Sequence, residues 1–133
     1  MSYEEILVID NWKNFKFIEQ QLKYQLKKDN IYNWMYPKQF KKNERLIFLL
    51  KNKKILSVLH ITINSDELEF SFSFTPIKQR RNGYNKLLRV YIINKFRELG
   101  ISKFTSTPFP NSNSIPLLES LGFKKVENQY KYS

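Results

Sequence analysis

The residues with the clearest capacity for chemistry lie in one short basic loop. Two adjacent arginines, Arg80 and Arg81, precede Gly83, which is one of only three glycines in the chain. From Tyr84 onward the apolar residues recur at helical spacing, so this loop would end at a helix N-terminus. Unpaired amides and the helix dipole favour an anion there, and arginines add charge-assisted hydrogen bonds. The pattern predicts a pyrophosphate site in which Gly83 supplies a positive φ or a close backbone approach.

The loop is neither of the two common phosphate-binding motifs. A P-loop would end in Lys followed by Ser or Thr, and a dinucleotide fingerprint would carry three glycines. Residues 79–85 have neither feature. Taken alone, one glycine beside two arginines is equally compatible with an ordinary surface loop, so the prediction needs a second motif.

A second motif lies farther along the chain. It runs from Asn111 through Ser114 to the pair Gly122-Phe123, with a short helix expected in between. The loop Arg80-Arg81-Asn82-Gly83-Tyr84-Asn85 resembles motif A of the GCN5-related N-acetyltransferases, and this second region resembles their motif B. The order of the expected elements is also similar to that family over almost the whole chain.

The resemblance implies a fold, a donor and a reaction. The fold would be one α/β domain over residues 1–133, of the α+β kind, with a mixed, mostly antiparallel central sheet flanked by helices. The expected order is β-α-β-β-β-α-β-α-β. Acetyl-CoA would be the acyl donor, and an amine would receive the acetyl group by direct attack on the thioester. No second histidine or cluster of carboxylates indicates a metal site. Dimers are frequent among relatives, so a homodimer is one alternative and the oligomeric state stays open.

The resemblance also implies a role for each matching residue. Arg80, Arg81, Asn82, Gly83, Tyr84 and Asn85 would hold the pyrophosphate, mainly through backbone amides. The strand end at Phe74 would bind the pantetheine arm through its main chain, and an N–H near it would polarise the thioester carbonyl. Asn111 and Ser114 would line the thiol end, where Ser114 or water could protonate the departing thiolate.

Two positions depart from the family pattern. Asn85 stands where the family prefers Gly or Ala, so a Cβ and an amide must fit near the phosphates. Leu118 stands where many members carry the tyrosine that protonates the thiolate, so the usual general acid is missing. A second hypothesis therefore stays open, in which the chain is a CoA-binding or interaction module with little or no catalysis.

The candidate general base is Glu69. It belongs to a segment in which polar and apolar residues alternate, which is typical of a strand with one buried face. Glu69 would point away from the apolar face, toward the acceptor amine, although a solvated carboxylate is the commoner case. The apolar face is expected to be core: Leu68, Phe70, Phe72 and Phe74. The only histidine, His60, is expected to be a core or edge residue with satisfied hydrogen bonds rather than a base.

Three aromatic residues stand close together in the irregular region after the first helix: Tyr32, Trp34 and Tyr36. Packing is the ordinary interpretation of such a cluster. The family usually places acceptor-recognition elements in this region, so a substrate-binding wall is the alternative.

The charge and composition bound the remaining function classes. The net charge of +11 suits a nucleic-acid-associated protein, which is a third hypothesis. It is less favoured, because 18 lysines against 5 arginines, spread along a chain without alanine, indicate a compositional bias. No apolar run is long enough to span a membrane, and the acidic N-terminus is unlike a secretory signal. With no cysteine there is no thiolate metal site, and a cytoplasmic protein is expected.

Periodicity and turn residues give the elements that would position these groups. Asp10 or Asn11 would cap the first helix, and Gly100 would end the second. Strands are expected at 6–9, 45–50, 55–63, 67–74 and 101–106, helices at 11–28, 84–99 and 113–121, and a final extended segment at 123–132.

Overall fold

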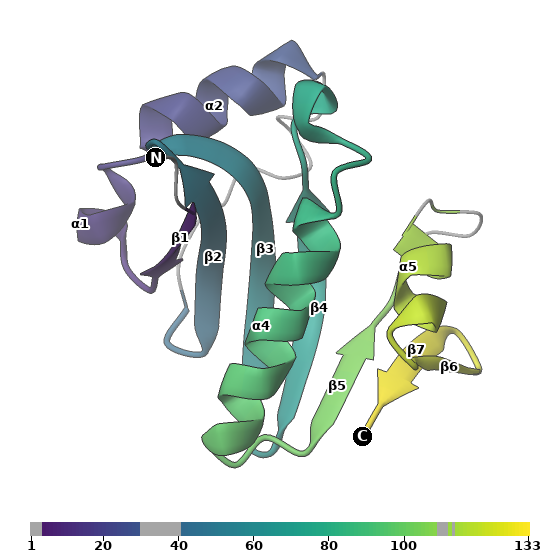
Figure 1. Cartoon of the computed structure of the whole chain (residues 1–133). Coiled ribbons are helices and arrows are strands. Elements are labelled where there is room, and N and C mark those ends of the chain that lie inside the picture. The colour runs from purple at the N-terminus through teal and green to yellow at the C-terminus, as the bar shows by residue number, and fades with distance from the viewer. Residues whose placement is uncertain (1–3, 30–40, 109–111, 113) are drawn as a thin grey trace.

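The computed structural model describes residues 4–29, 41–108, 112 and 114–133 (Figure 1). The elements in chain order are β1 (Glu4–Ile9), α1 (Trp12–Phe15), α2 (Glu19–Lys28), β2 (Glu44–Lys51), β3 (Lys54–Asn64), β4 (Glu67–Phe74), a 3-10 turn η1 (Ile77–Gln79), α4 (Tyr84–Glu98), β5 (Lys103–Ser106), α5 (Ser114–Ser120), β6 (Lys124–Val126) and β7 (Gln129–Tyr132).

The strands form one seven-stranded sheet in the order β1-β2-β3-β4-β5-β7-β6. Neighbouring strands are antiparallel except β4 and β5, which run parallel. This arrangement confirms the mixed, mostly antiparallel sheet that the sequence predicts. No helix in the described part of the chain combines the length and apolar character that a membrane span requires.

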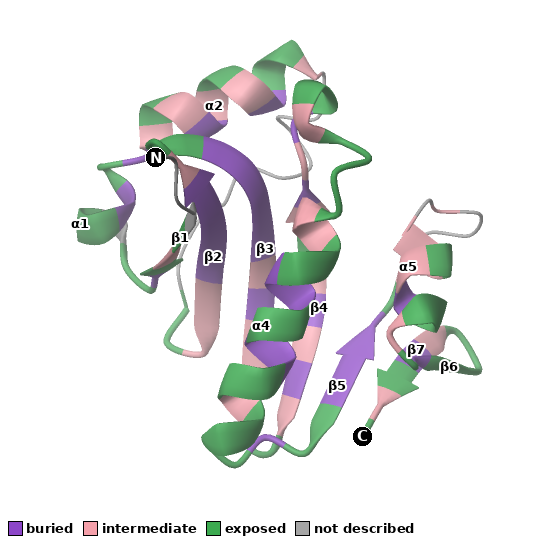
Figure 2. Cartoon of the chain, viewed as in Figure 1, coloured by how far each residue is buried: buried purple, intermediate pink, exposed green. Residues whose placement is uncertain are grey.

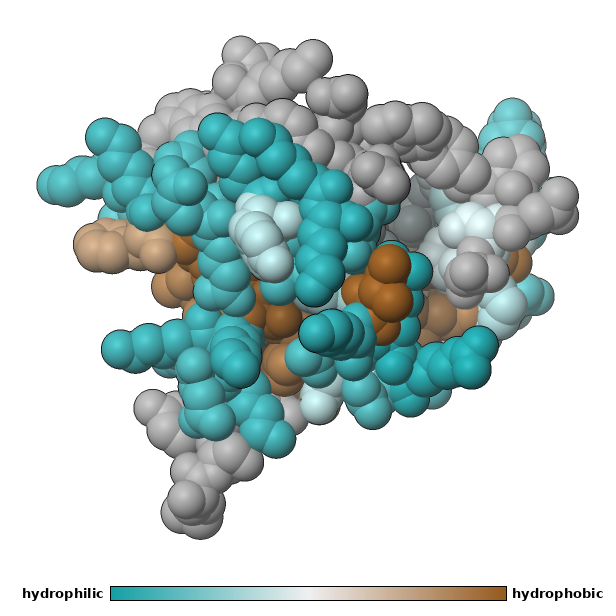
Figure 3. All heavy atoms as spheres, turned by 90° about the horizontal axis from the view of Figure 1, so that it is seen from above, coloured by the Kyte–Doolittle hydropathy of each residue, from teal (hydrophilic) through white to brown (hydrophobic). Residues whose placement is uncertain are grey.

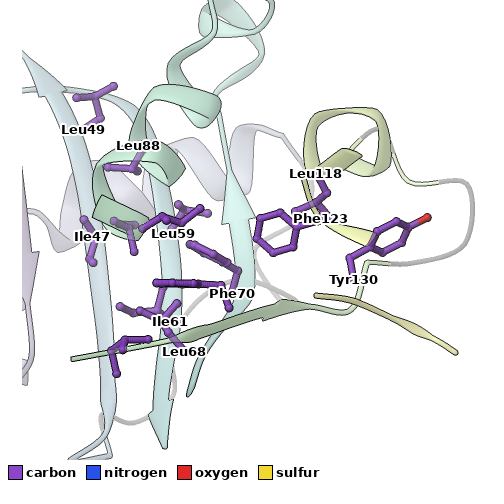
Figure 4. Close-up of a cluster of buried hydrophobic side chains, with 14 of the residues drawn as sticks. Ile47, Leu49, Leu59, Ile61, Leu68, Phe70, Leu88, Leu118, Phe123 and Tyr130 are labelled. Atoms are coloured by element: carbon purple, nitrogen blue, oxygen red, sulfur yellow. The ribbon is translucent and has the colours of Figure 1, made fainter. Parts of the chain in front are cut away.

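Helices cover both faces of the sheet and bury a separate core on each. One core lies beneath α4 and α5, and Figure 4 shows Leu88 and Leu118 from those helices in a cluster with Leu59, Phe70 and Phe123. The other core lies beneath α1 and α2 and includes Leu22, Leu26, Phe48 and Phe74. In Figure 2 the buried positions run through most of β2 and the first half of β3, and both cores draw residues from these two strands.

The expected helix at 11–28 is divided into α1 and α2, and the expected extended segment at 123–132 is divided into β6 and β7. Asn11 caps α1, because its Oδ1 accepts a hydrogen bond from the Asn14 amide at 2.9 Å. The amide of Ile18 then bonds the carbonyl of Phe15, three residues back, and this tighter turn separates α1 from α2. At the other end of the chain, a turn with Glu127 at φ +58° folds the last segment into the β6–β7 hairpin.

A β-bulge at Ser71 divides β4. Phe70 pairs with Ile61 and Phe72 pairs with His60, so Ser71 has no partner on β3. The extra residue turns the following side chains to the other face of the sheet. The expectation that the phenylalanines of this strand share one core face is therefore wrong: Phe70 packs beneath α4, Phe74 packs beneath α2, and Phe72 is 45% exposed.

The bulge also marks the point where β4 leaves β5. Their parallel pairing covers only Glu67–Phe70 against Lys103–Ser106, and Ser71 is the next residue of β4. On the other strand, Pro108 follows two residues after the last pair and has no amide to continue the ladder. Beyond this point the two strands diverge, as Figure 1 shows.

Candidate functional site

A hollow of about 890 Å³ lies where β4 and β5 diverge, at the N-terminal end of α4. Seven of the residues singled out in the sequence line it: Phe74, Arg80, Arg81, Gly83, Tyr84, Asn85 and Ser114. We call it the helix-end hollow. Figure 3 views the molecule from the side toward which this end of α4 points, and the described surface there is mainly hydrophilic.

The loop that enters α4 has a left-handed backbone at two positions. Gly83 is the N-cap of α4 with φ +76°, and Arg81 has φ +67°. A Cβ at position 83 would meet no atom within 4 Å, so the requirement for glycine there is conformational rather than steric. Asn82 does not line the hollow, and its Nδ2 instead donates to the Gln79 carbonyl at 3.1 Å. Because glycine offers no capping side chain, the first amides of α4 stay free for an anion.

The two arginines differ in how they are held. Arg80 Nε donates to the Thr75 carbonyl at 3.0 Å, and its Nη2 lies 3.8 Å from Asp29 Oδ2. Its side chain is nevertheless half exposed, at 52%. Arg81 is exposed at the rim of the helix-end hollow. The loop thus presents two cations beside a helix N-terminus, which suits a diphosphate.

The Asn85 side chain turns into the protein. Its Nδ2 donates to Ser57 Oγ at 3.1 Å, and its Oδ1 accepts a hydrogen bond from Arg89 Nε at 2.7 Å. Ser57 Oγ also lies 3.3 Å from the Phe74 carbonyl, so this chain of contacts joins α4 to β3 and β4. The side-chain amide of Asn85 therefore does not crowd the helix N-terminus. Its hydrogen bonds with Ser57 and Arg89 explain why this position is not Gly or Ala.

Arg89 is a buried cation without an acidic partner. It is 2% exposed and lies with Cζ 5.0 Å from the centre of the Phe70 ring. Burial lowers the pKa of Arg89 to about 10, so it is still protonated at neutral pH. Among the described residues no carboxylate pairs with it, and the stretches outside the description (1–3, 30–40, 109–111 and 113) contain no Asp or Glu. Among the described residues, Asn85 Oδ1 is thus the hydrogen-bond acceptor for this charge.

We expect Asn85→Ala to lower the free energy of unfolding by about 2 kcal/mol, because it leaves a charged donor buried without an acceptor. The double variant Asn85→Ala/Arg89→Met should recover at least half of this loss, since it removes the charge as well. Urea denaturation measures both values. Asn94→Ala, at an exposed position of the same helix, is the control and should change stability by less than about 0.5 kcal/mol. A double variant less stable than the single one would contradict this account.

A second hollow of about 410 Å³ lies on the opposite face of β4, and we call it the strand-face hollow. Its walls include Glu44, Thr62 and Glu69, which are paired across β2, β3 and β4 and so project from the same face. Thr62 Oγ1 lies 3.1 Å from Ser71 Oγ, which in turn lies 3.4 Å from Glu69 Oε1. Glu69 therefore points away from the α4 core, as the alternation predicted, and into a polar recess.

His60 also lines the strand-face hollow. Its Nε2 lies 2.7 Å from Glu44 Oε2, and each of the two side chains is 13% exposed. The Nδ1 atom is buried and has no hydrogen-bond partner among the described residues. The expectation of a fully satisfied histidine therefore holds for only one of its two ring nitrogens.

The thiol-end residues are only partly described. Ser114 begins α5, and its Oγ lies 2.8 Å from Ser112 Oγ. Leu118 is fully buried in the core, whereas Leu117 lines the helix-end hollow. Asn111, Tyr32, Trp34 and Tyr36 lie outside the described residues.

Sequence reasoning missed several residues of the two hollows. Glu44 and Thr62 belong to no motif, and only the register of β2, β3 and β4 brings them to the strand-face hollow. No group of three or more His, Cys, Asp or Glu side chains that could hold a metal ion occurs within the described ranges.

Solved structures resemble this chain over nearly its whole length. The ribosomal-protein-S18-alanine N-acetyltransferase of Escherichia coli has a TM-score of 0.70 at 14% identity, covering 98% of this chain and 91% of its own. The GNAT domain of PAT from S. lividans has a TM-score of 0.71 at 12% identity, with 97% and 89% covered. The PaiA N-acetyltransferase of Thermoplasma acidophilum, in complex with coenzyme A, has a TM-score of 0.65 at 12% identity, with 96% of both covered.

The likeness lies in the fold rather than in the sequence. No protein-family model matches the chain, and no curated protein matches it in sequence. At identities of 12% to 14% the structural comparisons establish the architecture alone. The chain therefore has the fold of the GCN5-related N-acetyltransferases, as its two motifs implied.

Proposed function

We propose that this protein is an acetyl-CoA-dependent N-acetyltransferase. The observation that carries the proposal is the pair of hollows that share β4. Residues 73–75 of the chain line the helix-end hollow, and residues 69–72 line the strand-face hollow. A donor held in the first would reach an acceptor held in the second at the place where β5 leaves β4. The fold neighbours support this assignment, because they are N-acetyltransferases and one is a coenzyme A complex.

The helix-end hollow would bind the donor. The amides at the start of α4, with Arg80 and Arg81, suit the pyrophosphate of coenzyme A. Beyond Phe70 the edge of β4 that faces β5 pairs with no strand in the described part of the chain, so the main chain near Phe74 can pair with the amides of the pantetheine arm. Ser114 and Asn111 would lie at the thiol end, where acetyl-CoA supplies an activated acyl group.

The strand-face hollow would hold the acceptor amine. Bringing the amine nitrogen against the thioester carbonyl is the main contribution expected of the protein. A backbone amide of β4 would stabilise negative charge on the carbonyl oxygen. Glu69 is the carboxylate on this wall that would attract the amine in its protonated form, and it was the sequence-based candidate for the base.

We expect Arg80→Ala/Arg81→Ala to weaken coenzyme A binding about 30-fold. At their degree of exposure each arginine should contribute about 1 kcal/mol, and 2 kcal/mol corresponds to that factor. Isothermal titration of wild type and variant with coenzyme A measures the change. The matched control is Lys124→Ala/Lys125→Ala, which removes the same charge from an exposed pair on β6 and should leave affinity within about threefold. If both double variants lose the same coenzyme A affinity, the arginines contribute only through the net charge of the protein and not through direct contacts with the pyrophosphate.

The wild-type protein itself tests the donor assignment. Coenzyme A at 100 times its dissociation constant should stabilise the fold by about 2.7 kcal/mol, which a thermal shift detects easily. No shift at millimolar coenzyme A would contradict the proposed function.

One observation favours a second candidate, a CoA-binding module without catalysis. Leu118, at the position of the usual tyrosine acid, is a buried core residue with no proton to give. Release of free thiol from acetyl-CoA in the presence of amines separates the two candidates. Turnover with any amine excludes the module, and binding without turnover favours it.

A further inference from the structure

We propose that His60, held by Glu44, takes the proton from the acceptor amine. This assignment rests on the proposed function, because it presumes that an amine enters the strand-face hollow. It concerns a histidine–carboxylate pair on β3 and β2, outside both sequence motifs and one strand away from Glu69.

Glu44 fixes the state of the His60 ring. Its Oε2 lies 2.7 Å from His60 Nε2, and a carboxylate can only accept a hydrogen bond, so Nε2 carries the ring proton. In the neutral imidazole, Nδ1 is then a bare acceptor with its lone pair available. A carboxylate in this position also stabilises the imidazolium that forms when the ring gains a proton. The Phe72 ring, 5.8 Å away between centroids, packs against the imidazole.

Nδ1 is the atom in this recess that lacks a partner. It is buried without a hydrogen bond among the described residues, which is a costly state for a polar atom. The hydroxyls of Thr62 and Ser71 bond each other, and the Lys41 ammonium can only donate. Nδ1 has almost no accessible surface in this conformation, so the side chains around the imidazole, among them the 45% exposed Phe72, must shift before an amine can reach it. An amine N–H would then satisfy Nδ1, which is the first step of proton transfer.

The position of His60 also suits this role better than that of Glu69. His60 pairs with Phe72, and the next residue of β4, Ser73, already lines the helix-end hollow. Glu69 instead pairs with Thr105, in the part of β4 that is still closed against β5. His60 thus lies nearer to the junction of the two hollows, and Glu69 is left to attract the ammonium.

The proton and bond changes balance as follows. The acceptor ammonium gives one proton to His60 Nδ1 and becomes a free amine. The nitrogen lone pair forms a bond to the thioester carbonyl carbon, the carbon–sulfur bond breaks, and a second proton passes from nitrogen to the sulfur, directly or through water. The products are the amide, coenzyme A as the thiol, and an imidazolium paired with Glu44, which returns its proton to solvent.

The test compares two kinds of acceptor with acetyl-CoA as donor. One is an alkylamine, taken as whichever of n-butylamine, ethanolamine and cadaverine the wild type acetylates fastest. The other is hydroxylamine, which is already a free base at neutral pH and needs no proton acceptor before it attacks. For His60→Gln we expect kcat with the alkylamine to fall about 100-fold while KM changes little. With hydroxylamine the same variant should stay within about threefold of wild type.

Two further variants assign the neighbouring groups. Glu44→Gln should lower kcat with the alkylamine about tenfold and leave kcat with hydroxylamine unchanged. The substitution removes the carboxylate that orients the His60 ring and stabilises its protonated form. Glu69→Gln should mainly raise KM for the alkylamine. Coenzyme A affinity, measured by calorimetry, should be unchanged in all three variants.

The outcomes are decisive in each direction. If His60→Gln keeps its alkylamine kcat within threefold, or loses both acceptors equally, His60 is a structural residue and the assignment is wrong. If the wild type binds coenzyme A but acetylates none of these acceptors, the proposed function is wrong, and the role of His60, which rests on it, is wrong as well. Loss of coenzyme A binding in His60→Gln would also overturn the assignment, since it would show that the substitution disturbs the donor site.

Discussion

Deleting Ser71 should abolish coenzyme A binding while the protein stays folded. Ser71 is the unpaired residue of the bulge in β4, and it follows directly after the last pair between β4 and β5. A bulge bends its strand, so the bend at this residue lets β4 turn away from β5. Without it, β4 would continue flat against its neighbours and the helix-end hollow would close.

The side chains of β4 tolerate this deletion because of their order. Before the bulge, Phe70 faces α4, and after it Phe72 and Phe74 face the other side. With Ser71 removed, Phe72 would follow Phe70 directly, and strict alternation would place each on the face that it already occupies. Removing Ser71 therefore straightens the strand without turning a core residue outward.

Circular dichroism and denaturant unfolding would report the fold, and calorimetry the binding. We expect a native spectrum, stability within about 2 kcal/mol of wild type, and an affinity for coenzyme A at least about 100-fold weaker. Ser71→Ala is the control: it keeps the bulge and should bind coenzyme A as the wild type does. Normal binding by the deletion variant would show that the bulge does not create the site.

The elements that the sequence predicted correctly are those whose signals are local. The helix from Tyr84 begins after a glycine in left-handed conformation, and Gly100 ends it with φ +101°. The turn at Asn52 and Lys53 has positive φ at both residues and joins β2 to β3, as its polar composition indicated. Such features depend on the conformational preferences of a few adjacent residues, which a single sequence contains.

The bulge at Ser71 has no such local signal. Apolar and polar residues alternate without interruption from Leu68 to Phe74, so the sequence predicts a regular strand. Whether the strand has a bulge depends on its register with β3 and on the divergence of β5, which are long-range properties. The same limitation hid the pairing of His60 with Glu44, since these residues meet only through the register of β2 and β3.

The donor loop illustrates a mixed outcome. The sequence placed Arg80, Arg81 and Gly83 correctly at a helix N-terminus beside a hollow. It did not reveal that Asn85 serves a buried Arg89, because both residues look like ordinary surface positions of a helix. Only the packing of α4 against β3 and β4 shows which of its polar residues face inward.

Replacement of Phe70 by alanine should destabilise the protein by about 3–5 kcal/mol, whereas Phe72→Ala should cost about 1 kcal/mol or less. Phe70 is 3% exposed, with its ring between Phe123 and the Arg89 guanidinium, so its removal leaves a cavity in the core under α4. Phe72, two residues along the same strand, is 45% exposed and loses mainly its contact with His60. Against a total stability of about 5–15 kcal/mol, the first loss removes at least about a fifth of the free energy of unfolding.

The two substitutions make each other's control, because they remove the same side chain from the same strand. An unbroken strand would place both phenylalanines on one face and make their losses similar. The bulged strand makes them differ by at least about 2 kcal/mol, and parallel urea titrations measure that difference directly. Equal losses of stability would show that Phe72 is a core residue and that β4 has no bulge at Ser71. The opening between β4 and β5, on which the donor site depends, would then lack its physical explanation.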